Sequence, residues 1–478
     1  MSFSLFKRRS FWLAAAYLIG VAAVLYFFFA AYGYDDPYIT YRYANNLRHG
    51  LGFVFNPGEQ VLSTTTPLFA MLLAALGLFV ENLPQTANLI SAVSIAAGGL
   101  LLWQLARQWK LNAASWAALA LYPTFSLLLQ TTGSETPLYI TLGLAALAAY
   151  QARRYKTTAV LAALTGLARP DGVLVAGVLG LHYLVFEWRR ARAIPWAALA
   201  IYLAINLAWY GFAWFYFGYP LPVTLAAKQQ QGSMAISQQF FAGFFKVAGW
   251  YNTWPYWLEL GLAALGAFWC VRRRSPAWLL LAWVAVYFAG YSLLGVSQYF
   301  WYYAPLVPGF VLLVSLGVEA LWAGRSQWRG WAGVAVLLTL TAAAMQAQDA
   351  LHLSQVRDTR LPRYTQTGLW LAQNIPAEAR VGLLEVGIIG YYAPQSLVDF
   401  AGLIQPAVAR QLKRETSYDD AALWAVEAYQ PEYLALAAGT LPQFREAYVN
   451  LHCQPIHLIE DPSEKKINME IYHCQTAP

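Results

Sequence analysis

Apolar blocks long enough to cross a bilayer recur from Phe11 to Gln346, separated by short charged patches. The hydrocarbon core of a membrane is about 30 Å thick, and a helix of about 20 apolar residues crosses it. Of the 478 residues, 59% are hydrophobic and 12% are charged, whereas soluble domains carry about a quarter charged residues. The pattern predicts a polytopic α-helical membrane protein. It excludes a soluble enzyme, a disordered chain, a disulfide scaffold and a porin-type barrel, whose strands would alternate.

About 11 transmembrane helices are predicted. They are Phe11–Ala31, Ala87–Trp103, Ala113–Gln130, Pro137–Tyr150, Thr158–Ala168, Val173–Trp188, Pro195–Phe217, Pro255–Val271, Ala277–Gly295, Tyr303–Trp322 and Gly330–Gln346. Thr158–Ala168 is short and is expected to pair with the next helix as a broken or partly inserted hairpin. Pro67–Val80 is also apolar and short, and it either crosses the membrane or lies in the interface.

Basic residues decide between these two positions of Pro67–Val80. If this segment lies in the interface, 16 of the 21 Lys and Arg residues up to Gln346 fall in the cytoplasm, as the positive-inside rule requires. The cytoplasmic patches lie at residues 7–9, 107–110, 153–156, 189–192, 272–274 and 325–329. If the segment crossed, every later patch would move outside. The chain is therefore predicted to be a multi-pass cell-membrane protein with a cytoplasmic N-terminus.

Charge also divides the chain into two parts. The net charge is +7, but up to Gln346 there are 21 basic and 9 acidic residues, and from Ala347 onward 10 and 15. Because the excess positive charge follows the membrane segments, no nucleic-acid partner is predicted. We predict a transmembrane domain at 1–346, with a first outer loop at 33–86 carrying interfacial helices. A soluble extracytoplasmic α/β domain is predicted at 347–478.

Short elements are expected in this second part. The predicted strands are Val381–Tyr391 and Tyr433–Ala437, and the predicted helices are Thr367–Asn374, Tyr418–Tyr429 and Leu441–Val449. His457–Ile459 and Ile467–His473 are expected to form a hairpin around residues 461–464. Cys453 and Cys474 lie in this domain, where either a disulfide or two free thiols fit the sequence.

Two adjacent carboxylates, Asp35 and Asp36, stand at the start of the first outer loop. The stretch from Asp36 to Gly50 is typical of a capped helix, with Asp36 as N-cap and Pro37 at the first helical position. That cap would account fully for Asp36. Asp35 has no such structural role, and ionisable groups near a membrane are expensive and usually functional. Asp35 is therefore the predicted general base, and Asp36 is predicted to assist it.

Further polar residues of the outer face are candidates for substrate binding. Arg169 could clamp a phosphate bidentately, although Arg169 and Asp171 could equally form a structural turn. Lys228 could also bind phosphate, or be an ordinary exposed lysine. Glu135 stands at a helix start, where it either acts in the site or favours the helix dipole. Arg42 is a further candidate.

Aromatic residues gather at Tyr299–Tyr303. Trp301 and Tyr302 could stack on a sugar or belong to the aromatic belt of the interface. No metal site is predicted, because the chain lacks HExxH, a cysteine cluster and zinc-site spacing, although paired Asp residues leave a divalent ion open. No phosphate-binding GxxxxGK[ST] or GxGxxG motif is present, so no nucleotide or other cofactor is predicted.

The first loop carries a dense series of short motifs. They are Asp-Asp-x-Tyr-Ile from Asp35, Arg-Tyr-Ala-x-Asn from Arg42, Gly-x-Gly-x-x-x-Asn-Pro-Gly-Glu from Gly50 and Thr-x-Pro-Leu from Thr65. Over about Tyr34–Leu68 this series resembles the first periplasmic loop of GT-C glycosyltransferases. It is most similar to the mycobacterial terminal arabinofuranosyltransferases of cell-wall arabinan. The sequence departs from that subfamily at Leu62-Ser63, which puts the acceptor specificity in doubt.

The resemblance implies an inverting glycosyltransferase. Its donor would be a polyprenyl-phosphate sugar, and its acceptor would be a hydroxyl of a glycan, lipid or protein outside the cytoplasm. An acid of the first loop, Asp35 or Asp36 here, would deprotonate the acceptor. The alternative function is a transporter or flippase of lipid-linked sugars. Transporters tend to show internal repeats and ionisable groups at the bilayer midplane, whereas here no repeat is found and only Glu259 lies within a helix.

Overall fold

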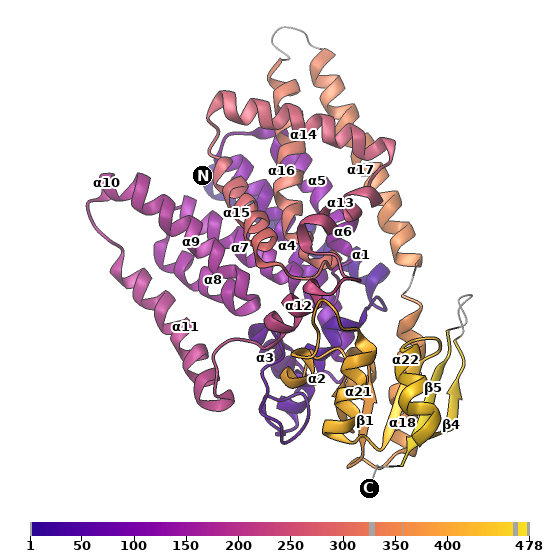
Figure 1. Cartoon of the computed structure of the whole chain (residues 1–478). Coiled ribbons are helices and arrows are strands. Elements are labelled where there is room, and N and C mark those ends of the chain that lie inside the picture. Colours follow the sequence, from indigo (N-terminus) through magenta and orange to yellow (C-terminus); the bar gives the residue numbers. More distant parts are fainter. Residues whose placement is uncertain (1, 325–329, 357, 462–466, 476–478) are drawn as a thin grey trace.

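The protein is a helical bundle with a small α/β domain packed at one end, beside the first loop (Figure 1). The computed structural model describes residues 2–324, 330–356, 358–461 and 467–475. Each of the eleven predicted membrane segments contains helix, although Ala113–Gln130 is divided into two helices by a short turn. The helices are α1 Ser2–Phe29, α4 Leu83–Gln108, α5 Asn112–Leu121, α6 Ser126–Leu129, α7 Thr136–Gln151, α8 Tyr155–Ala168, α9 Val173–His182, α11 Trp196–Phe217, α14 Trp254–Arg273, α15 Trp278–Leu294, α16 Val307–Ala323 and α17 Gly330–Gln355.

Among the described residues, six helical stretches are long and apolar enough to cross a membrane. Five of them are Trp12–Phe29, Leu83–Gln108, Pro170–Glu187, Trp196–Phe217 and Phe300–Ala323, and the sixth begins at Gly330. Together with the shorter apolar helices such as α15, they make this a multi-pass helical membrane protein. The count of eleven crossings stays a prediction. The basic patch at 325–329 lies outside the described residues.

The first loop (residues 33–86) folds into two helices, α2 Asp35–Arg48 and α3 Pro67–Leu76. Helix α2 begins one residue earlier than expected. Its N-cap is Tyr34, and no side chain caps it. The prediction that Asp36 is the N-cap is therefore wrong, because Asp36 lies within the first turn, where its side chain is free to face elsewhere. Two more short helices follow α11 along the chain, α12 Thr224–Ser233 and α13 Phe240–Trp250.

A five-stranded mixed sheet forms the centre of the C-terminal domain, which begins at α18 Arg360–Asn374. The strands are β1 Arg380–Leu383, β2 Ser396–Asp399, β3 Tyr433–Ala437, β4 Cys453–Ile459 and β5 Met469–Cys474, in the order β2-β1-β3-β5-β4. Strand β1 runs parallel to β2 and β3, and β5 is antiparallel to β3 and β4. The connecting helices include α19 Gly387–Tyr392, α20 Pro406–Ala409, α21 Tyr418–Tyr429 and α22 Pro442–Phe444.

The expected hairpin, β3 and α21 are confirmed, but the predicted strand Val381–Tyr391 is only half right. Its first residues form β1, whereas its second half folds as α19. A short apolar run does not distinguish a buried strand from a buried helix. Cys453 and Cys474 are joined in a disulfide. The predicted domain boundary at residue 346 falls inside α17, which continues to Gln355, and residues 462–466 of the predicted hairpin turn lie outside the described ranges.

A buried carboxylate closes one helix end within the bundle. Glu319 of α16 accepts hydrogen bonds through Oε2 from the backbone N–H groups of Ala113 (2.8 Å) and Ala114 (3.0 Å). These two groups belong to the first turn of α5, where no carbonyl of the helix itself is available. Glu319 therefore caps α5 from a distant helix and fixes how α5 packs against α16.

Replacing Glu319 by Ala is expected to lower the free energy of unfolding by about 2 kcal/mol, because it leaves buried N–H groups without an acceptor. Glu319→Gln keeps a side-chain oxygen and should cost less. Thermal and denaturant unfolding in detergent would measure both. Glu187→Gln is the matched control, since Glu187 pairs with the exposed Arg153 and such surface pairs contribute about 1 kcal/mol or less. Equal losses for Glu319→Ala and Glu187→Gln would contradict the capping role.

Candidate active site

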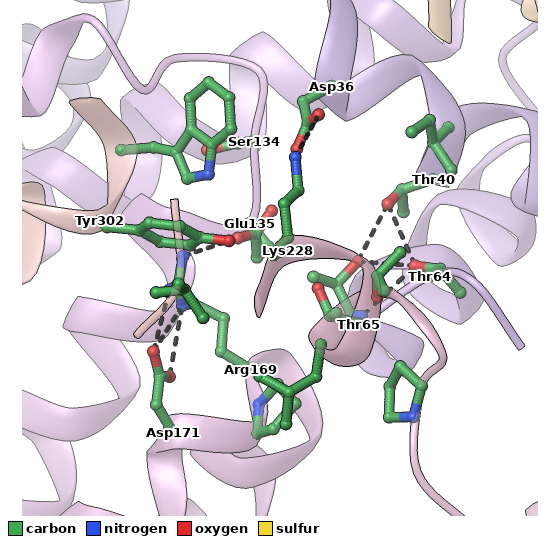
Figure 2. Close-up of a pocket in the computed structure, with 18 of the residues that line it drawn as sticks. Asp36, Thr40, Thr64, Thr65, Ser134, Glu135, Arg169, Asp171, Lys228 and Tyr302 are labelled. Carbon is green, nitrogen blue, oxygen red and sulfur yellow. Dashed lines mark hydrogen bonds and ion pairs between the residues drawn. The ribbon is translucent and has the colours of Figure 1, made fainter. Parts of the chain in front are cut away.

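A cavity of about 420 Å³ lies where the first loop meets the ends of several bundle helices (Figure 2). Its walls come from α2, the loop before α3, the start of α7, the turn before α9, α12 and the end of α15. Seven of the predicted site residues line it: Asp36, Glu135, Arg169, Asp171, Lys228, Trp301 and Tyr302. Segments far apart in the sequence thus bring most of the predicted site together. Asp35 and Arg42 do not line this cavity.

Asp36 and Lys228 face each other at the cavity. Lys228 Nζ lies 3.7 Å from Asp36 Oδ1, and the Lys228 side chain is 8% exposed against 34% for Asp36. The ammonium group also lies 3.8 Å from the centre of the Tyr299 ring, which favours the cation. Burial alone would lower the pKa of Lys228, but Asp36 and Tyr299 outweigh it, so this pKa lies above its usual range. The site therefore holds a charged lysine beside a partly exposed carboxylate.

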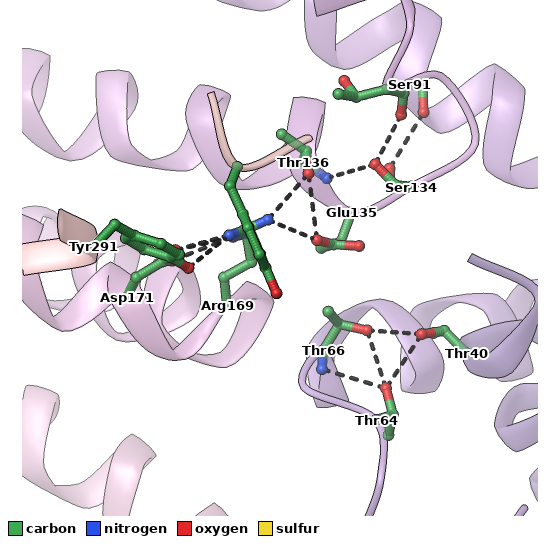
Figure 3. A network of polar contacts seen from close by, with 12 residues as sticks. Thr40, Thr64, Thr66, Ser91, Ser134, Glu135, Thr136, Arg169, Asp171 and Tyr291 are labelled. Carbon is green, nitrogen blue, oxygen red and sulfur yellow. Dashed lines mark hydrogen bonds and ion pairs between the residues drawn. The ribbon is translucent and has the colours of Figure 1, made fainter. Parts of the chain in front are cut away.

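Arg169 is the centre of a second polar cluster (Figure 3). Its guanidinium donates to both Asp171 oxygens, with Nη2 to Oδ2 at 2.9 Å, and Nη1 donates to Glu135 Oε1 at 3.1 Å. Further donors reach Thr136 Oγ1 and the Tyr291 hydroxyl, which itself donates to Asp171. Because these contacts use every N–H direction of the guanidinium, Arg169 is committed to protein partners. Arg169 and Asp171 form the turn that one reading of the sequence expected, and that turn lies in the cavity wall.

Hydroxyl groups form another wall of the cavity. The Oγ1 atoms of Thr40, Thr64 and Thr66 lie 3.0–3.2 Å from one another, and Thr65 and Ser134 also line the space. None of these was predicted as a site residue. The run Ser63–Thr66 before Pro67 was the available signal, since a series of small hydroxyl side chains in an outer loop suits recognition of polar ligands.

The remaining walls are aromatic and aliphatic. Trp301 stacks on Tyr299, with ring centres 4.5 Å apart, and Tyr34 stacks on Trp301 at 5.4 Å. Tyr302 lies over the Arg169 guanidinium. The aliphatic lining includes Val173, Leu174, Leu221, Leu225 and Leu294. The cavity therefore offers charged and hydroxyl groups beside an apolar wall, as small-molecule binding sites commonly do.

Asp35, the predicted general base, has a structural partner instead. Its two oxygens accept hydrogen bonds from the backbone N–H groups of Gly387 (3.1 Å) and Ile388 (2.8 Å) in the C-terminal domain. Burial, and then the nearby Glu385 charge, raise the pKa of Asp35 to about 7. A pKa of this size would suit a general base. However, both Asp35 oxygens already accept backbone N–H groups, and Asp35 does not line the cavity. The premise that Asp35 has no structural role is therefore wrong, and Asp36 is the member of the pair that lines the cavity.

The prediction that Arg42 binds substrate is wrong. Its guanidinium donates to the carbonyls of Gly390, Ala393 and Gln395 in the C-terminal domain, and through Nε to Phe55. The side chain is buried, and a buried guanidinium needs such partners. Arg42 ties the first loop to the C-terminal domain.

No group of three or more His, Cys, Asp or Glu side chains that could hold a metal ion occurs within the described part of the chain. Asp36, Glu135 and Asp171 share the cavity, but Lys228 and Arg169 occupy the positions beside them. The prediction of a site without a metal or other cofactor stays a prediction.

Comparison with solved structures finds several similar folds, ArnT and AglB among them. ArnT from Cupriavidus metallidurans bound to undecaprenyl phosphate has a TM-score of 0.60 at 14% identity, covering 96% of this chain and 97% of that one. The archaeal oligosaccharyltransferase AglB from Archaeoglobus fulgidus, in complex with an inhibitory peptide and a dolichol-phosphate, has a TM-score of 0.63 at 13% identity. That match covers 98% of this chain and 74% of AglB.

A family model described as a domain of unknown function (DUF8728) matches residues 350–467, which are most of the C-terminal domain. No curated protein matches the chain. The similarity to mycobacterial terminal arabinofuranosyltransferases stays a prediction, whereas the predicted fold is confirmed. The chain shares its overall fold with the solved ArnT and AglB structures, and in this chain that fold is a polytopic helical membrane domain followed by a soluble α/β domain.

Proposed function

We propose that this protein is an inverting glycosyltransferase that moves a sugar from a polyprenyl-phosphate donor to an acceptor hydroxyl. The observation that carries the proposal is the pair Asp36–Lys228, a partly exposed carboxylate beside a buried ammonium in one cavity. A single-displacement transfer needs one base for the acceptor and one stabilising group for the leaving phosphate. The bound undecaprenyl phosphate of ArnT and dolichol-phosphate of AglB support this class of donor.

In the proposed reaction, Asp36 takes the proton of the acceptor hydroxyl. The acceptor oxygen bonds to the anomeric carbon while the bond from that carbon to the phosphate oxygen breaks, and the electron pair leaves with the phosphate. The configuration at the anomeric carbon inverts. Lys228 stabilises the leaving phosphate. Its ammonium is available for this role because its ion pair with Asp36 is long, at 3.7 Å. Arg169 holds Glu135 and Asp171 in place, so that these carboxylates are available to the sugar hydroxyls.

The donor is proposed to be a single sugar on a lipid chain. Thr40, Thr64 and Thr66 offer hydroxyls to the sugar, Trp301 and Tyr302 offer ring faces, and the aliphatic wall receives the first isoprene units. On the resemblance of the first loop, arabinofuranose is the first sugar to test. The acceptor class, a glycan, lipid or protein, is left to the assay below.

The reaction is proposed to occur on the extracytoplasmic face of the plasma membrane, with the N-terminus in the cytoplasm. The charge distribution supports this orientation. The Cys453–Cys474 disulfide also supports it, since disulfides persist in oxidising compartments. Labelling of single cysteines, introduced in the first loop and in the C-terminal domain, from either side of intact cells would test it.

A transfer assay tests the function itself. The purified protein in proteoliposomes would receive polyprenyl-phosphate sugars, with arabinofuranose, other pentoses and hexoses in parallel, and pools of envelope glycans, lipids and peptides. We expect one donor to yield free polyprenyl phosphate and a glycosylated acceptor of inverted anomeric configuration by NMR. Movement of the labelled donor across the bilayer without any transfer would instead identify a flippase and overturn the proposal.

A further inference from the structure

The C-terminal domain holds the first loop at three separate places. Asp35 accepts hydrogen bonds from the start of α19, and Arg42 donates to the residues that follow α19. Asn56 pairs with Leu397 of β2 in both directions, with its Nδ2 to the carbonyl oxygen at 2.9 Å and its Oδ1 to the backbone N–H at 3.0 Å. Every one of these contacts joins a side chain of the first loop to the backbone of the C-terminal domain.

The closest of these approaches requires a glycine. A Cβ atom on Gly387 would lie 2.0 Å from the Asp35 carbonyl oxygen and 2.7 Å from its carboxyl carbon. The first of these atoms belongs to the backbone, so a change of side-chain rotamer cannot relieve the clash. Asp35 is also the first residue of α2, next to Asp36. The backbone position of the cavity carboxylate is therefore set by contact with α19.

We propose that the C-terminal domain is a positioning element for the transfer reaction, with Asp35 and Gly387 as its positioning residues. Asp35 contacts no substrate: both of its oxygens accept N–H groups of α19, and it does not line the cavity. It acts through Asp36, which it holds at a fixed distance from Lys228. The proposal rests on the proposed function, and it gives a role to the domain of unknown function matched over residues 350–467.

A positioning element matters because the rate of the transfer reaction is sensitive to small displacements of the base. A base must be within hydrogen-bond reach of the acceptor proton, and a displacement of about 1 Å can cost about 100-fold in rate. The first loop contains helices α2 and α3, and no side chain caps the first turn of α2, so that turn needs constraints from elsewhere in the chain. The C-terminal domain, which lies outside the helical bundle, supplies these constraints on the first turn of α2. Leu403, from the same domain, also lines the cavity, and the Ala401 carbonyl accepts a hydrogen bond from Gln231 in α12.

Two substitutions test the proposal in the full-length protein. Gly387→Ala pushes the start of α2 away, and Asp35→Asn replaces one acceptor oxygen by an amide that cannot accept an N–H. Gly249→Ala is the control, because no atom lies within 4 Å of an added Cβ at that helical glycine. Titration with polyprenyl phosphate gives the number of binding sites and the dissociation constant, and the transfer assay then gives kcat per binding site and KM.

We expect Gly387→Ala to lower kcat per binding site about 100-fold, and Asp35→Asn about 10-fold or more, with the affinity for polyprenyl phosphate unchanged. The double variant should be no slower than the slower single variant, since both act on one contact. Gly249→Ala should behave as the unaltered protein.

A role in folding alone would instead lower the number of binding sites and leave kcat per site intact, and that result would overturn the proposal. Unaltered kcat in both variants of an active enzyme would overturn it as well, while leaving the proposed function in place. Absence of transfer by the unaltered protein with every donor would overturn the proposed function, and this inference with it.

Discussion

Asp36→Asn is expected to lower the transfer rate by at least about 100-fold, the usual contribution of a positioned general base. The amide has nearly the same size as the carboxylate but cannot take the proton of the acceptor hydroxyl. Because Asp36 is partly exposed at the cavity and the contact that the change weakens is its 3.7 Å ion pair with Lys228, the variant should remain folded. Initial rates at saturating donor, together with binding of polyprenyl phosphate, would separate the loss of chemistry from any loss of binding.

The matched control is Glu81→Gln, which removes an exposed acid from the same loop and should leave the rate unchanged. Glu135→Gln tests the competing assignment. Glu135 lines the cavity too, but its Oε1 accepts a hydrogen bond from Arg169 at 3.1 Å, so we expect a smaller loss. A near-complete loss in Glu135→Gln, with an active Asp36→Asn, would show that the base has been assigned to the wrong carboxylate.

Lys228→Met is expected to weaken binding of the donor and to lower kcat by about 100- to 1,000-fold, the usual cost of losing one group that stabilises developing charge. Methionine keeps the length and apolar stem of the side chain while removing the charge. The unaltered protein should bind polyprenyl phosphate more tightly than the uncharged polyprenol. In Lys228→Met this preference should disappear, because the apolar wall binds both lipids equally.

Lys246→Met is the control for charge, since Lys246 is an exposed lysine on α13 outside the cavity. It should keep both the rate and the preference for phosphate. If Lys228→Met kept that preference, Arg169 would have to release Asp171 or Glu135 to bind the phosphate. The proposed division of roles between the two basic residues would then be wrong.

The positions of the membrane-domain helices could be predicted from the sequence, but not all of their ends: α1 and α17 extend about nine residues beyond the predicted segments, and Ala113–Gln130 divides into α5 and α6. Segments such as Pro195–Phe217 and Pro137–Tyr150 reappear as α11 and α7 with ends shifted by a residue or so. The reason is that in lipid every backbone polar group must be satisfied within the segment, so a long apolar run has only the helix open to it. In the soluble domain that constraint is absent, and Val381–Tyr391 divided into β1 and α19 because tertiary packing chose between two allowed conformations.

Much of the composition of the site was also predicted from the sequence, because charged side chains near a membrane are costly and usually functional. Seven of the nine predicted residues line the cavity, whereas Asp35 and Arg42 bind the backbone of the C-terminal domain. The sequence did not show which of the two neighbouring acids lines the cavity. Asp35 and Asp36 are neighbours with the same chemistry, and their assignment depended on where α2 begins and on which backbone approaches it. Gly387 lies more than 300 positions away in the chain, and no local pattern announces such a contact.

The residues alone were enough to predict a membrane bundle with a soluble domain and to identify the loop that carries the acids, because burial of backbone and charge in lipid has so few solutions. The packed chain was needed to show that Asp36 faces Lys228, that Arg42 and Asp35 bind the C-terminal domain, and that threonines line the cavity. Those outcomes depend on contacts between distant segments, whose directions are fixed only when the whole chain has packed.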